Sequence, residues 1–80
     1  MSRTEVRLPQ FSMGMSDAEI LGWLVSDGDV VEAEAELVEV EAEKATTTVN
    51  APAAGVVREI SVGAGDVVAV HELLCVIEAA

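Results

Sequence analysis

The stretch Leu37–Asn50, LVEVEAEKATTTVN, decides the fold predicted for this chain. Apolar and acidic residues alternate along its first half, so Val38, Val40 and Ala42 share one face of a strand and the glutamates share the other. Threonine and valine dominate the second half, and such β-branched residues favour strands. The segment Glu43-Lys44-Ala45 lies between the two halves, where it forms the tip of a predicted hairpin.

Lys44 is the only lysine in the chain. A lone lysine in a turn is most often an ordinary solvated residue, so its position alone decides nothing. The sequence offers no competing catalytic site, because it has a single histidine, no Ser/His/Asp set and no glycine-rich phosphate loop. A stiff body of strands that presents one lysine on a projecting turn suits a covalent attachment point.

The length of 80 residues allows one domain, 1–80, with a single core. Its formal net charge is −11 and its pI is near 4.1, which argues against binding to nucleic-acid phosphates or to an anionic membrane. The sequence shows no signal peptide and no apolar stretch that spans a bilayer. These features predict a cytoplasmic, monomeric domain.

Five further segments have the composition of strands and are separated by turn residues. They are Thr4–Leu8, Ile20–Val25, Val56–Val62, Val67–Val68 and Leu73–Ile77. Within the acidic stretch Glu32–Glu43, the glutamates change from even to odd positions after Glu36. A straight strand cannot keep both sets on one face, so we expect a turn or bulge near Glu36 and a strand that starts at Leu37.

The sequence also predicts whether several individual side chains are buried or exposed. In the surface loop predicted for Gln10–Asp17, Met13 and Met15 are expected to pack across the loop base. Trp23 is expected to cover the core, and His71 to lie in a surface loop. The only cysteine, Cys75, lies in an apolar strand and is expected to be a buried structural thiol.

No metal site is predicted. The carboxylates of Glu39, Glu41 and Glu43 are spread along a strand face by their period of two, whereas a cation needs them to converge. The turn Asp27-Gly28-Asp29 lacks the spacing of a calcium loop, so we interpret the acidic residues as a solvated face.

An internal repeat relates the two halves of the chain. A shift of 37 residues aligns Gly28-Asp29-Val30-Val31 with Gly65-Asp66-Val67-Val68, and Leu37 with Leu74. Two like halves of short strands predict two small antiparallel sheets related by a pseudo-two-fold axis. The same shift places the equivalent of Lys44 just beyond the last residue, so the lysine tip and the termini are expected at opposite ends.

Six motifs distributed over the whole chain are specific in combination: Leu8-Pro9, Gly28-Asp29-Val30, Leu37–Ala45, Ala51-Pro52, Gly55 and Gly65-Asp66-Val67. In these motifs the chain resembles the biotinyl/lipoyl domain family. The segment Val40–Ala45 looks like the lipoyl version, because biotinyl domains usually have methionine on both sides of the acceptor lysine and here Glu43 and Ala45 stand there. Lipoyl domains usually have Asp before the lysine, and Glu43 keeps that charge.

This resemblance implies an all-β fold, a flattened barrel or sandwich of two four-stranded antiparallel sheets (a barrel-sandwich hybrid). It implies lipoate linked to Lys44, with Glu43 and Ala45 as the flanks that a lipoylating enzyme recognises. It implies a non-catalytic carrier, most like the lipoyl domain of a 2-oxo acid dehydrogenase complex acyltransferase. The partners implied are a thiamine-diphosphate-dependent decarboxylase, an acyltransferase core and the FAD-dependent dihydrolipoamide dehydrogenase.

The segment from Leu8 to Met15 is more similar to domains of pyruvate or acetoin complexes than to those of 2-oxoglutarate complexes. The chain is then expected to be a fragment of a larger dihydrolipoamide acyltransferase. Three alternatives stay open: a biotin carboxyl carrier domain, the lipoylated carrier of glycine cleavage, and an unmodified structural adaptor.

Overall fold

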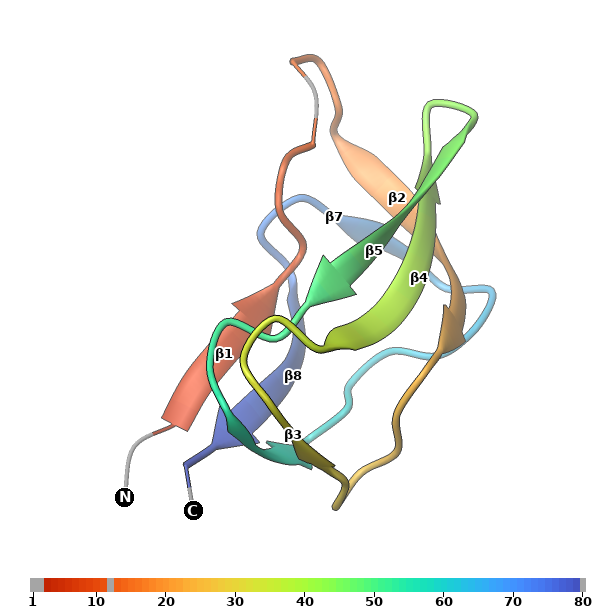
Figure 1. Ribbon diagram of the computed structural model, residues 1–80. Coiled ribbons are helices and arrows are strands. Elements are labelled where there is room, and N and C mark those ends of the chain that lie inside the picture. Colours follow the sequence, from red (N-terminus) through yellow and green to blue (C-terminus); the bar gives the residue numbers. More distant parts are fainter. Residues whose placement is uncertain (1–2, 12, 80) are drawn as a thin grey trace.

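The computed structural model describes residues 3–11 and 13–79, which form two four-stranded antiparallel sheets that face each other (Figure 1). The strand order of the first sheet is β1 (Arg3–Arg7), β8 (Leu73–Glu78), β6 (Gly55–Arg58) and β3 (Val30–Val31). That of the second is β5 (Ala45–Asn50), β4 (Glu36–Ala42), β2 (Asp17–Trp23) and β7 (Val67–Ala69). The sheets do not close into a barrel, so the predicted all-β sandwich is confirmed.

The predicted two-fold repeat is present in the sheets. Exchanging β1 with β5, β8 with β4, β6 with β2 and β3 with β7 converts one sheet order into the other. The turns repeat as well: the Asp29 carboxylate accepts a hydrogen bond from the Ser26 amide at 2.8 Å, and the Asp66 carboxylate accepts one from the Gly63 amide at 2.8 Å. The glycines between them, Gly28 and Gly65, have φ angles of 96° and 92°.

Backbone hydrogen bonds cross between the two halves at these turns. The Gly28 amide donates to the Val57 carbonyl at 2.7 Å, and the Val57 amide donates back to the Asp29 carbonyl at 2.8 Å. In the symmetric pair, the Gly65 amide donates to the Ile20 carbonyl at 2.8 Å, and the Ile20 amide donates to the Asp66 carbonyl, also at 2.8 Å. Each half therefore supplies the hydrogen-bond partners of the other half's turn.

The core lies between the sheets and is built from the inward faces predicted for the strands. Its largest fully buried side chains are Leu8, Ile20, Leu37, Leu74, Ile77, Val38, Val40, Val57, Val68 and Cys75. Leu37 and Val38 are both buried although they are consecutive, because the β4–β5 register shifts between Glu36 and Val38. This is the irregularity expected near Glu36.

Cys75 and Trp23 occupy the places predicted for them. Burial of Cys75 raises the pKa of its thiol from 9.0 to about 11, which keeps it protonated and unreactive at neutral pH. Trp23 is half-buried against the core, and its indole N–H donates to the Val62 carbonyl at 2.9 Å. His71 is exposed in the loop before β8, as expected.

Several details differ from the sequence-based predictions. Met15 is buried, but Met13 is 97% exposed, because Gly14, with a φ of 90°, turns the chain between them. The strand predicted for Val56–Val62 ends at Arg58, since Glu59 has a left-handed φ of 54° that interrupts the ladder. The short strand β3 was not predicted, and β2 begins at Asp17 rather than Ile20 because residues 17–19 pair with β7.

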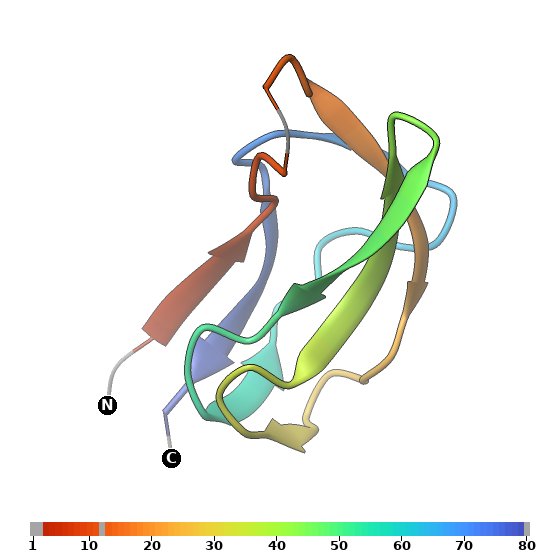
Figure 2. The same cartoon turned by 45° about the horizontal axis from the view of Figure 1, so that its top comes forward.

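The two ends of the elongated domain have different structures. Its extents are 36 × 21 × 18 Å, and the β4–β5 turn and the β1–β2 loop lie at one end. The strands next to the two termini pair with each other at the other end, Arg3 opposite Glu78 (Figure 2). The expected separation of the lysine tip from the termini is confirmed.

Gly55 is the glycine at which a side chain has no room. An added Cβ would clash with the Glu78 carbonyl oxygen and lie 2.9 Å from Cγ2 of Ile77. Gly55→Ala is therefore expected to lower the free energy of unfolding by roughly 1–3 kcal/mol, measured by urea denaturation. Gly63→Ala is the control, since no atom lies within 4 Å of its added Cβ. Equal stability of the two variants would contradict this packing.

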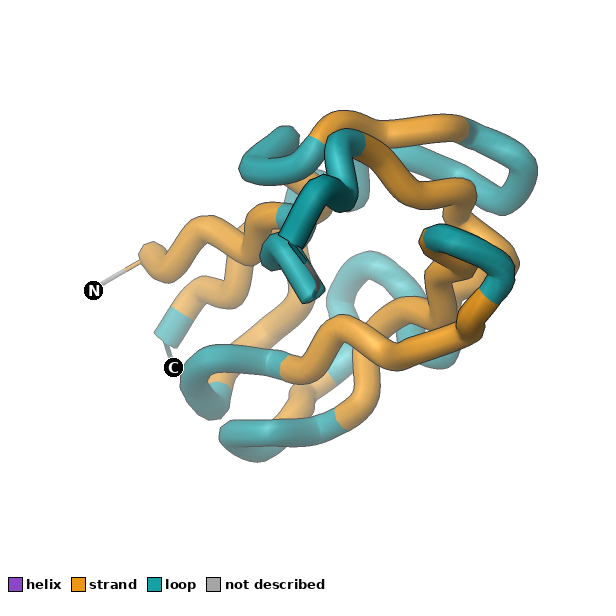
Figure 3. Tube along the Cα trace, turned by 90° about the horizontal axis from the view of Figure 1, so that it is seen from above, coloured by secondary structure: helices purple, strands orange, loops and turns teal. Residues whose placement is uncertain are grey.

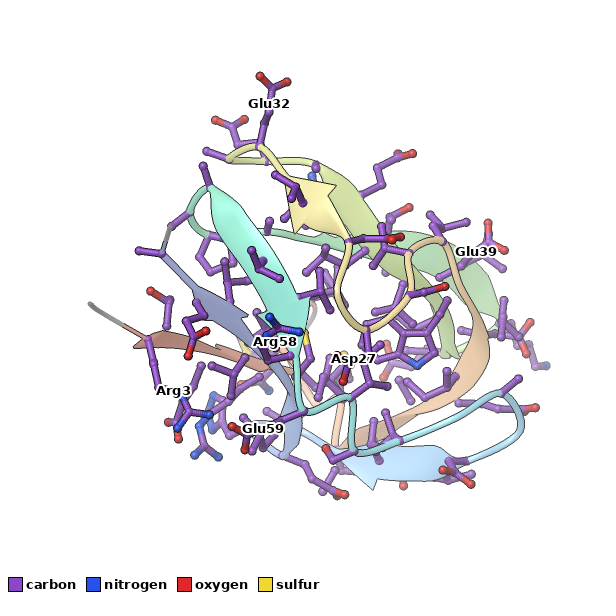
Figure 4. All side chains as sticks on the ribbon, turned by 90° about the horizontal axis from the view of Figure 1, so that it is seen from below. Arg3, Asp27, Glu32, Glu39, Arg58 and Glu59 are labelled. Carbon is purple, nitrogen blue, oxygen red and sulfur yellow. The ribbon has the colours of Figure 1, made fainter. Side chains whose placement is uncertain are left out.

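The two-fold repeat predicts matched contributions from Asp29 and Asp66, whose carboxylates accept equivalent backbone hydrogen bonds. Asp29→Ala and Asp66→Ala are each expected to cost roughly 0.5–1.5 kcal/mol in thermal or chemical unfolding. Glu32→Ala serves as the control, because that exposed side chain points away from the body of the protein (Figure 4). A large loss for one aspartate and none for the other would argue against equivalent turns.

Candidate functional site

The turn between β4 and β5 contains two residues, Glu43 and Lys44, because Ala42 pairs directly with Ala45. Both turn residues have left-handed φ angles, 52° for Glu43 and 66° for Lys44. This combination is typical of a type I′ turn, whose twist matches that of the two strands it joins. Such turns usually have asparagine or glycine at these positions, whereas here Glu43 and Lys44 adopt the left-handed conformation.

The three residues predicted as the site, Glu43, Lys44 and Ala45, lie together and are all exposed. They form the outer end of the β4–β5 hairpin, which projects beyond the body of the sandwich (Figure 1). In the described part of the chain, no salt bridge involves Lys44, so its ammonium group faces solvent at the tip.

Carboxylates cover the outer face of the sheet that carries this tip. Glu19 on β2 lies directly opposite Glu41 on β4. Glu39 precedes Glu41 by two residues on β4 and therefore lies on the same face. All three are exposed, and among residues 3–11 and 13–79 none of them forms a salt bridge. We call these three residues the acidic face; the like charges give the tip a negative surrounding.

The three arginines form ion pairs with carboxylates outside the acidic face. Arg3 pairs with Glu59, Arg7 with Glu5 at 2.9 Å, and Arg58 with Asp27 at 3.6 Å (Figure 4). A surface hollow of about 690 Å³ lies along β1 and β8, but its walls carry paired charges and no reactive group. Three of the four cationic side chains are thus withdrawn from the candidate site.

A smaller hollow lies against the tip itself. The β1–β2 loop and the β4–β5 turn are at the same end of the molecule, as the view from above shows (Figure 3). Between them is a hollow of about 210 Å³, lined by Phe11, Met15, Ala42, Glu43, Ala45 and Thr47. Sequence reasoning placed Met15 at the loop base but missed this hollow; the only signal was the presence of the chain's single phenylalanine in the same loop.

Two further features are absent from the described residues, 3–11 and 13–79. No group of three or more His, Cys, Asp or Glu side chains is arranged to hold a metal ion. No helix there is long and apolar enough to cross a membrane.

Comparison with known proteins gives consistent matches along the chain. A family model described as "Biotin-requiring enzyme", for biotin and lipoyl domains, matches residues 4–77. The chain is 35% identical over 75 residues to the dihydrolipoyllysine-residue acetyltransferase component of the pyruvate dehydrogenase complex from Staphylococcus aureus. The protein of that name from Staphylococcus epidermidis is 33% identical over 75 residues. Both alignments cover 94% of this chain but only 17% of the relative.

A solved structure has the same fold. The lipoyl domain of the 2-oxoglutarate dehydrogenase complex from Azotobacter vinelandii superposes with a TM-score of 0.75 and 30% sequence identity. The match covers 95% of this chain and 98% of that domain. By sequence and by fold, this chain belongs to the biotinyl/lipoyl domain family and is similar to the lipoyl domains of 2-oxo acid dehydrogenase complexes.

Proposed function

We propose that this domain carries lipoate in amide linkage to Nζ of Lys44. The observation that carries the proposal is the position of Lys44, the chain's only lysine, exposed on a two-residue turn at the end of a hairpin. The group fits this place, because an amine on an open turn can enter the active site of a modifying enzyme. Glu43 and Ala45 are then the flanks that this enzyme contacts.

The role of the protein in this proposal is to position the group and to limit where it can travel. Lipoate supplies a dithiolane ring that accepts acyl groups and electrons. The paired strands β4 and β5 hold Lys44 at the outer end of the domain, clear of the core. Tethering at such a point replaces diffusional encounters by high effective concentrations at successive active sites.

The acidic face supports recognition by basic partner surfaces. Glu19, Glu39 and Glu41 lie on the outer face of the sheet that ends in the tip, and no cation among the described residues forms a salt bridge with them. Amide formation at Lys44 removes the positive charge of the tip and leaves this face more negative still. The partners proposed are the lipoylating enzyme, a thiamine-diphosphate-dependent 2-oxo acid decarboxylase and the FAD-dependent dihydrolipoamide dehydrogenase.

The assembly proposed is a 2-oxo acid dehydrogenase complex of the pyruvate or acetoin type. The sequence relatives are components of pyruvate dehydrogenase complexes, and the chain spans about one sixth of their length. We infer that the domain acts as the carrier part of a larger acyltransferase, whose core receives the acyl group. A cytoplasmic location and a monomeric isolated domain stay predictions.

A second candidate is a biotin carboxyl carrier on the same fold. The observation that favours it is the matching family model, which describes biotin-requiring enzymes as well. The residues around Lys44 argue against it, because Glu43 and Ala45 occupy the places at which biotinyl domains usually have methionine.

The modification can be tested by intact mass. After expression with an active lipoate ligase and a biotin ligase, we expect a single lipoyl increment, mapped to Lys44 by peptide fragmentation. Lys44→Arg should carry no increment, because the chain has no other lysine. A biotinyl increment would favour the carboxyl carrier. No increment, with a control domain modified in the same cells, would contradict both and favour the structural adaptor.

The acidic face can be tested by charge removal. Replacing Glu39 and Glu41 by Gln is expected to lower kcat/KM for reductive acylation by the decarboxylase, roughly threefold to tenfold at low ionic strength. The effect should shrink at high salt, because these exposed charges are screened. Glu32→Gln with Glu34→Gln is the matched control, an equal charge change beside β3, remote from the tip. Equal kcat/KM values for the two double variants would show that the decarboxylase does not recognise the acidic face.

A further inference from the structure

The 210 Å³ hollow beside the lysine tip is bounded by two segments far apart in sequence. Phe11 and Met15 come from the β1–β2 loop, and Ala42, Glu43, Ala45 and Thr47 come from the hairpin. The residues on both sides of Lys44 thus belong to its wall. Anything attached to Lys44 begins at the rim of this hollow, without having to cross the surface of the domain.

The wall of the hollow is mostly apolar and is held in place by hydrogen bonds. Met15 is buried, with 4% of its surface exposed, whereas Phe11 is 42% exposed. The Phe11 amide donates to Sδ of Met15 at 3.3 Å, and the Gln10 side-chain amide donates to the Met15 carbonyl at 3.4 Å. These contacts hold the loop backbone at Phe11 and Met15 together, and the side chains of both residues line the hollow.

The size and chemistry of the hollow fit a small sulfur-containing ring. At roughly 30 Å³ per water molecule, 210 Å³ holds about seven waters, comparable to a five-membered ring with part of an alkyl chain. Divalent sulfur makes favourable contacts with aromatic rings, which Phe11 supplies here. Transfer of apolar groups from water to the Ala42, Ala45 and Met15 side chains is favourable as well.

We propose that the oxidised dithiolane ring of a lipoyl group on Lys44 rests in this hollow, against Phe11 and Met15. The identity of the occupant rests on the proposed function; the hollow is a property of this chain. Many rotatable bonds separate the ring from the backbone, so the arm can fold back to residues next to its own attachment point. Ordering those bonds costs entropy, so the docked arm exchanges readily with the extended arm that a partner enzyme binds.

The test observes the ring directly by NMR and does not depend on any ligase. Lipoate is attached to Lys44 chemically, through an activated ester, and the species acylated at Lys44 is purified and identified by peptide fragmentation. Methionine methyl groups are labelled with ¹³C. We expect the Met15 methyl signal to shift on acylation and to show a nuclear Overhauser contact to the ring protons. The Met13 methyl, 97% exposed in the same loop, should show neither.

Variants distinguish docking from an indirect change in the loop. Ala45→Leu fills the hollow from the hairpin side and should abolish the contact between the ring and the Met15 methyl. Phe11→Ala removes the aromatic wall and should weaken that contact, whereas Met13→Ala, the control in the same loop, should retain it.

The outcomes separate this inference from the proposed function. Absence of any contact from the ring to Met15 or Phe11, with acylation of Lys44 verified, overturns the docking proposal even if a ligase lipoylates the domain. A contact that persists unchanged in Ala45→Leu overturns it too. A clear contact in the chemically acylated domain supports docking of the ring in the hollow. If lipoate ligase then fails to modify the unacylated domain, the proposed function is overturned instead.

Discussion

The structure depends on the exchange of backbone hydrogen bonds between its two halves. The turn around Gly28 bonds to Val57 in the second half, and the turn around Gly65 bonds to Ile20 in the first half. The strand residues that these turns bond, Val57 and Ile20, are fully buried, and leaving their backbone groups unpaired would be costly. The two sheets therefore form together, and each contains strands from both halves.

This interlocked body holds the hairpin in place. β4 is paired on both sides, with β2 and β5, so the segment that ends in Lys44 is anchored along its length. The strands next to the termini lie at the opposite end, where Arg3 pairs with Glu59 and Arg58 with Asp27. The domain thus separates the lysine tip, in an acidic setting, from the end at which β1 begins and β8 ends.

Local patterns in the sequence were sufficient for the fold and for the position of Lys44. Alternation from Leu37 to Ala42 predicts the hairpin, the parity change of the glutamates predicts the irregularity at Glu36, and the repeat predicts two equivalent sheets. The hollow beside the tip could not be predicted in this way. It requires Phe11 and Met15 to meet residues 42–47, and such a contact depends on how the sheets stack rather than on any local period. The exposure of Met13 and the early end of β6 at Arg58 depend on single left-handed residues, Gly14 and Glu59, which periodicity does not reveal.

The central claim is that modification depends on the place of the lysine at the turn and not on the presence of a lysine in an acidic segment. The most direct measurement is the extent of lipoylation, by intact mass, of a variant in which Glu43→Lys and Lys44→Glu are combined. This exchange keeps the composition and net charge and moves the amine by one residue within the two-residue turn. The account predicts full modification of the natural chain and little or none of the exchanged one. Equal modification of both would contradict it.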